Sequence, residues 1–108
     1  GARFYSCGIP LEMADYSVMS GTFNYAPGLS VKAWRDYLFT SLNSIWNLTR
    51  CRMIFNLMIS EEDKITPQSI SYIRKETMFN FCQNNLGTTN EYFSSKLPRE
   101  ITFCVSKN

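Results

Sequence analysis

The chain has 108 residues, 44% of them hydrophobic and 15% aromatic, and its formal net charge is only +2. This size and composition predict one domain with a core, and the charge lacks the basic excess of a protein that lives on nucleic acid. The sequence contains no histidine, which removes the side chain that most often moves protons near neutral pH and argues against an enzyme.

The N-terminal part predicts a strand followed by a helix. Residues 3–11 read as a short edge strand, because apolar residues surround Cys7 and Pro10 disfavours a helix. Gly1 and Ala2 are interpreted as a remnant of processing or of a cleaved tag, so the expected domain spans residues 3–108. Residues 15–26 carry one apolar stripe with helical spacing, at Tyr16, Met19, Phe23 and Ala26, behind Asp15 as a candidate N-cap.

The rest of the chain predicts more strands than helices. Residues 30–48 and 66–82 each fit both a helical and a strand pattern, and Thr66 is a candidate cap if the second of them is helical. Residues 52–60 form a nearly continuous apolar run, which is typical of a buried central strand, and residues 98–105 predict a closing strand. Residues 84–87 have turn composition. The expected class is α+β, with one N-terminal helix and an antiparallel sheet.

The four cysteines predict a disulfide-closed, secreted domain. An even number of cysteines in a short chain is typical of a disulfide framework. A zinc site is not expected, because at least 21 residues separate neighbouring cysteines. Three connectivities are open to four cysteines, and we favour Cys7–Cys104 with Cys51–Cys82. Joining the two ends closes the largest loop and would stabilise the fold by about 4 to 5 kcal/mol.

A short motif at the N-terminus carries a family resemblance. Tyr5-Ser6-Cys7 is an aromatic-x-Cys motif, and Cys104 lies close to the other end of a chain without histidine. In motif, length and cysteine placement the chain resembles the secreted RNase-like effectors of powdery mildew fungi. Residues 16–26 resemble the single helix of that family, and residues 79–82 resemble a late strand. The resemblance implies the fold of small fungal guanyl-specific ribonucleases, a helix packed on a curved antiparallel sheet.

The resemblance also implies a function without catalysis. Ribonucleases of this type need a general acid, normally histidine, and this chain has none. We therefore assign no catalytic residue, and the glutamates are interpreted as solvated surface residues; they are Glu12, Glu76, Glu91 and Glu100. The implied protein is a pseudoenzyme and virulence effector that acts in the host plant cytoplasm after delivery. It would bind host proteins to suppress immunity, and an intracellular NLR receptor could recognise it as an avirulence effector.

Exposed aromatic rings are the candidate partner-binding residues, because aromatic anchors dominate binding hot spots. The candidates are Tyr5, Trp34, Tyr37, Trp46 and Tyr92. We expect a monomer with no cofactor and no metal, and no membrane span because the chain has no run of about 18 apolar residues.

Two other functions stay open. The first is a non-catalytic RNA-binding module that uses a ribonuclease-type groove, with Arg50, Arg52, Arg74 and Lys75 as the candidate phosphate contacts. The second is an ectodomain fragment that carries a glycan on Asn47, in the sequon Asn47-Leu48-Thr49.

Overall fold

A computed structural model of the chain describes residues 2–5, 13–21, 23–94 and 96–107. The elements, in chain order, are β1 (Ala2–Tyr5), β2 (Ala14–Met19), α1 (Val31–Asn47), β3 (Thr49–Met58), β4 (Lys64–Ile65), β5 (Ser71–Tyr72), α2 (Lys75–Asn85), β6 (Thr88–Ser94) and β7 (Leu97–Ser106). The expected combination of helices and strands is confirmed.

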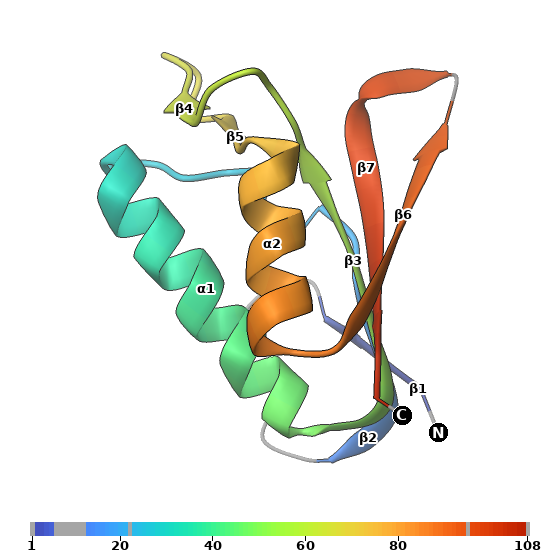
Figure 1. The fold of residues 1–108 in the computed structure, drawn as a ribbon. Helices are drawn as coiled ribbons and strands as arrows, with labels where there is room; N and C mark the ends of the chain where they lie inside the picture. The colour runs from blue at the N-terminus through green and yellow to red at the C-terminus, as the bar shows by residue number, and fades with distance from the viewer. Residues whose placement is uncertain (1, 6–12, 22, 95, 108) are drawn as a thin grey trace.

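Five of the strands form one mixed sheet in the order β1-β2-β3-β7-β6. Strands β1, β2 and β3 are parallel, whereas β7 runs antiparallel to both of its neighbours. Strands β4 and β5 form a separate antiparallel pair. Both helices lie on the same face of the five-stranded sheet (Figure 1). The expected antiparallel sheet with a single N-terminal helix is therefore wrong, because three strands are parallel and two helices are present, one after β2 and one after β5.

The core lies between this face and the two helices. On α1, Trp34, Leu38, Leu42 and Ile45 are buried at helical spacing, and Ser30 caps the helix by accepting a hydrogen bond from the Ala33 N–H at 3.1 Å. Residues 30–48, which fitted two patterns, thus form a helix because a four-residue apolar stripe can be buried along it.

The expected central strand at residues 52–60 is confirmed by β3, the middle strand of the sheet. Met53, Phe55 and Leu57 point into the core at the alternate spacing of a strand. The expected closing strand is confirmed by β7, where Phe103 stacks on Phe55 with ring centroids 5.4 Å apart. The edge strand expected at residues 3–11 is confirmed at Ala2–Tyr5, and residues 6–12 lie outside the described residues.

The helix expected at residues 15–26 is wrong. This segment contains β2, which pairs with β1 on one side and with β3 on the other, and Asp15 belongs to the strand instead of capping a helix. The stripe that suggested a helix does not share a face, because Met19 is buried while Tyr16 is exposed. Gly21 ends the strand region with φ +72°, a left-handed conformation that favours glycine.

The segment at residues 66–82 contains a turn, β5 and the first part of α2. Thr66 does not cap a helix, since its side chain accepts a hydrogen bond from the Ile70 N–H at 3.1 Å inside a turn. The helix begins at Lys75, and Met78 and Cys82 form its buried side. Residues 79–82, which resembled a late strand, are therefore helical, because Met78 and Cys82 share one helix face four residues apart.

The expected Cys51–Cys82 disulfide is not formed. Cys51 is exposed at the start of β3, whereas Cys82 is buried in α2 with its Sγ 3.7 Å from the Met78 Sδ. Packing of α2 on the core directs the Cys82 thiol inward, away from the exposed Cys51 thiol. Cys104 is also unbonded and half-buried, and its expected partner Cys7 lies outside the described residues.

Candidate ligand-binding edge of the sheet

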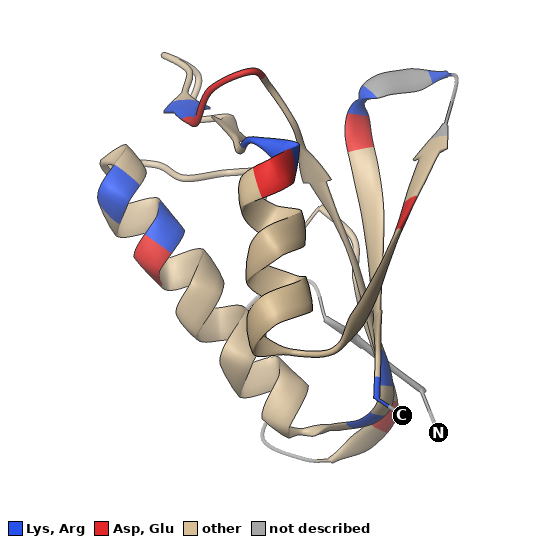
Figure 2. Cartoon of the chain, in the orientation of Figure 1, with Lys and Arg blue, Asp and Glu red and all other residues tan. Residues whose placement is uncertain are grey.

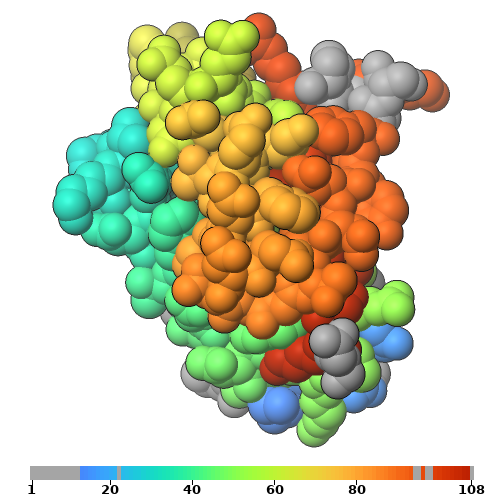
Figure 3. Space-filling model, viewed as in Figure 1, coloured from blue at the N-terminus to red at the C-terminus, as the bar shows by residue number. Residues whose placement is uncertain are grey.

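Two clefts flank the loop that follows the carboxyl end of β3. The first has a volume of about 450 Å³ and is lined by Ile59, Ser60, Glu61, Arg74, Lys75, Glu76 and Phe93. The second, of about 370 Å³, shares Ile59 to Glu61 and adds Glu62, Lys64 and Arg99. Figure 3 shows the start of α2 beside this loop on the molecular surface. Ligands of α/β sheets commonly bind at the carboxyl ends of parallel strands, so this edge is the first candidate site.

Charged side chains gather at the same edge. Figure 2 marks charged residues on the loop after β3, at the start of α2 and near the start of β7, and further ones on the first half of α1 and at the opposite end of the sheet. Asp63 fixes this arrangement, because its carboxylate accepts a hydrogen bond from the Arg74 N–H at 2.8 Å and pairs with Arg35 at 3.3 Å. Arg74, the residue that precedes α2, provides no side-chain cap for the helix. The edge therefore offers charges of both signs on a fixed loop.

A polar network joins the ends of β2 and β3. The Asn56 Oδ1 accepts a hydrogen bond from the Gly21 N–H at 2.7 Å, and the Asn56 Nδ2 donates to the Glu100 carboxylate at 2.6 Å. The same Nδ2 lies 3.4 Å from the Ser20 hydroxyl. Among the described atoms, none lies within 4 Å of the position that a Cβ on Gly21 would take. The network thus holds a carboxylate and an amide beside open space.

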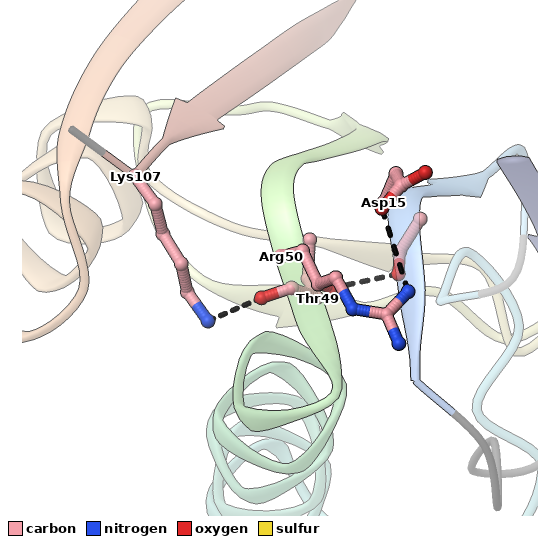
Figure 4. A network of polar contacts seen from close by, with 5 residues as sticks. Asp15, Thr49, Arg50 and Lys107 are labelled. Carbon is pink, nitrogen blue, oxygen red and sulfur yellow. Dashed lines mark hydrogen bonds and ion pairs between the residues drawn. The ribbon is translucent and has the colours of Figure 1, made fainter. Parts of the chain in front are cut away.

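A second polar network lies at the opposite end of β3 (Figure 4). The Lys107 ammonium donates to the Trp46 carbonyl at 2.7 Å and to the Thr49 carbonyl, and it lies 4.6 Å from the centroid of the Trp46 ring. Arg50 pairs with Asp15 at 3.4 Å between β3 and β2. Cations near the last carbonyls of a helix stabilise it, so this network has a structural role at the end of α1.

The structure separates the expected partner-binding rings. Trp34 is 1% exposed, and its Nε1 donates to the Phe23 carbonyl at 3.1 Å, so its expected role at a surface is wrong because the ring belongs to the core. Trp46 is half-buried under Lys107. Tyr37 and Tyr92 are 45% and 59% exposed, but Tyr37 lies on α1 and Tyr92 on the sheet face away from the helices. The side chain of Tyr5 lies outside the described residues.

The four expected phosphate contacts lie in two separate places. Arg50 and Arg52 lie at the start of β3, while Arg74 and Lys75 line the first cleft beyond its other end. At about 3.3 Å per residue, the strand separates Arg50 from Ile59 by about 30 Å. The described residues therefore do not bring these cations into one groove. Asn47 is exposed at the end of α1, and Thr49 of its sequon is buried.

The sequence pattern did not predict the network around Asn56 or most of the residues that line the two clefts. Asn56 was a detectable signal, because it is a polar residue inside the apolar run of β3. Glu61 and Glu62 directly follow the apolar run and mark only its end in the sequence, and Phe93 gave no signal. Within the described ranges, no three His, Cys, Asp or Glu side chains are grouped to hold a metal ion, and no helix is long and apolar enough to cross a membrane.

Comparison with known proteins identifies a fold and no family. No protein-family model matches the chain, and no curated protein matches it. A solved structure titled "DhpI-SAH complex structure" superposes with a TM-score of 0.55 at 9% sequence identity. The match covers 90% of this chain and 48% of that one, so the chain spans about half the length of DhpI. The likeness shows a shared fold over nearly all of the chain.

Proposed function

We propose that this chain is part of a methyltransferase-type α/β domain and contributes to the binding of an S-adenosyl compound at the carboxyl edge of β2 and β3. The observation that supports the proposal most is the fold, which 90% of the chain shares with DhpI, a protein solved with SAH. SAH is what S-adenosylmethionine becomes when it gives up its methyl group. In sheets of this type the carboxyl edge of the parallel strands is the usual place for a ligand.

The residues at this edge fit part of the chemistry of an S-adenosyl compound. Such a compound carries two ribose hydroxyls, which carboxylate and amide side chains commonly bind. Glu100 and Asn56 offer these groups, and Gly21 leaves space beside them. When bound, S-adenosylmethionine would supply the methyl group of its sulfonium sulfur. The residues of this chain would position the ligand. Asn56 fixes both the turn at Gly21 and the Glu100 carboxylate.

Isothermal titration of the protein with SAH, and with adenosine as a comparator, tests the proposal. We expect SAH to bind and Asn56→Ala to weaken binding by about tenfold, because the half-buried Asn56 amide holds Gly21 and Glu100 by hydrogen bonds and its loss costs about 1 to 2 kcal/mol. Asn90→Ala, an exposed position on β6, is the matched control and should bind like the unsubstituted protein. Absence of binding at about 1 mM SAH by a folded protein would contradict the proposal.

The secreted effector role and the RNase-like comparison stay predictions. Expression in leaves of a host plant, with immune signalling as the readout, tests the effector role directly. Because Tyr37 and Tyr92 are exposed and Trp34 is buried, Tyr37→Ala and Tyr92→Ala are the variants that could remove a partner contact without disturbing the core. An unchanged immune readout with the unsubstituted protein would contradict the role.

A further inference from the structure

The first cleft at the carboxyl end of β3 has the size of a small-molecule site. Its volume of about 450 Å³ lies within the range of about 300 to 1,000 Å³ that is typical of such sites. Its walls come from three parts of the chain: Ile59 after β3, Arg74 and Lys75 at the start of α2, and Phe93 near the end of β6. These elements are fixed by the sheet and by the hydrogen bond between Arg74 and Asp63, so the cleft is formed before any ligand arrives.

One side of the cleft is apolar. The Phe93 ring is 56% exposed although it lies on the sheet face that carries α2, and Ile59 is half-buried beside it. An exposed ring at the wall of a cleft has a face available for stacking. The Lys75 ammonium lies 5.4 Å from the centroid of this ring. A ligand on the ring would therefore meet a positive charge at its border.

The charged residues of the cleft favour an acidic ligand over a basic one. Neither Arg74 nor Lys75 forms an ion pair with a described residue, whereas Arg35 and Arg50 do. The carboxylates of Glu61 and Glu76 also line the cleft, but both residues are exposed, while Lys75 is half-buried. Water and salt screen the exposed charges more than the half-buried one. Lys75 is thus the charge that a bound ligand would experience most strongly.

We infer that this cleft binds a small molecule with an aromatic or other apolar body and one acidic group, carboxylate or phosphate. The body would lie against Phe93 and Ile59, and the acid would meet Lys75 and Arg74. The inference depends on the cleft alone and does not depend on S-adenosyl binding.

The test uses three probes of similar shape: benzoate, phenyl phosphate and the uncharged benzamide. Titrations followed by amide chemical shifts give both the affinity and the location of each probe. We expect shift changes at residues 59–61, 74–76 and 93, with at least one of the acids binding about fivefold or more tighter than benzamide. Equal affinities for the acids and benzamide, or changes located elsewhere, would overturn the inference.

Two variants make the test specific. Lys75→Met keeps most of the side-chain length and removes the charge, and should weaken the acids by about fivefold while leaving benzamide unchanged. Lys32→Met is the control, because the Lys32 side chain is 87% exposed on α1 outside this cleft. Equal acid affinities in both variants would overturn the role of Lys75. SAH titrations of the same samples separate this result from the S-adenosyl proposal.

Discussion

Gly87, which follows the C-cap residue Leu86 of α2, lies against the indole ring of Trp46 on α1. A Cβ at position 87 would come within 3.1 Å of two atoms of this ring and would also clash with the Ser106 carbonyl oxygen. The carbonyl belongs to the backbone of β7 and cannot rotate away as a side chain could. The turn from α2 into β6 therefore passes through a space that fits only glycine, where both helices and the sheet meet.

Gly87→Ala should destabilise the fold by about 1 to 3 kcal/mol, the usual cost of overpacking. Urea unfolding followed by tryptophan fluorescence measures the loss. Asn84→Ala is the control, because Asn84 is exposed near the end of the same helix and should change stability by less than about 0.5 kcal/mol. Equal unfolding midpoints for Gly87→Ala and the unsubstituted protein would show that the turn can accommodate a Cβ at this position.

Phe39 on α1 and Phe81 on α2 should be energetically coupled. Their rings stack with centroids 4.3 Å apart and an interplanar angle of 11°, which makes them a direct contact between the two helices. A double-mutant cycle with Phe39→Leu and Phe81→Leu should give a coupling energy of about 0.5 to 1.5 kcal/mol. Strictly additive changes would contradict a direct energetic contact between these two rings.

Lys107→Met should destabilise the end of α1 by about 1 to 2 kcal/mol. The substitution removes the ammonium that donates to the Trp46 and Thr49 carbonyls, while it keeps an apolar stem against the indole ring. Thermal unfolding measures the effect, and Lys32→Met serves as the matched control because its side chain is 87% exposed. Equal losses in the two variants would contradict a specific role for Lys107.

Cys82 should resist thiol reagents in the folded protein. Burial raises the pKa of Cys82 to about 12 by desolvating the thiolate, so almost none of the reactive form exists at pH 8. Ellman's reagent should label the exposed Cys51 quickly and Cys82 only after unfolding in urea. Peptide mapping identifies the labelled site. A Cys51–Cys82 disulfide in the purified protein would contradict the structure.

The same pKa shift predicts a loss of stability at high pH. The folded-state pKa of Cys82 lies above the usual thiol value of 9.0, so its stabilising contribution is complete below about pH 9 and declines as the pH rises toward about 12. The difference in urea midpoint between the unsubstituted protein and Cys82→Ala should therefore shrink over this range. Cys51→Ala, at an exposed thiol, is the control. A constant difference would contradict the shift.

The local sequence pattern was sufficient to predict an element that buries a long, regular series of apolar residues. The run in β3 and the apolar stretch in β7 predicted both strands, because a strand with alternate residues in the core needs little information from elsewhere. The absence of histidine and the low net charge likewise limited the chemistry of the site from composition alone.

Tertiary structure decided what depends on distant partners. Residues 15–26 had helical spacing, yet β2 forms because β1 and β3 pair with both of its edges, and those hydrogen bonds are absent from any local window. The cysteines were paired by loop length, but packing placed Cys82 in the core and Cys51 at the surface. The first cleft combines residues 59–61, 74–76 and 93. Only the path of the chain through β3, α2 and β6 brings them together, so periodicity and composition could determine β3 and β7 but neither β2 nor the candidate site.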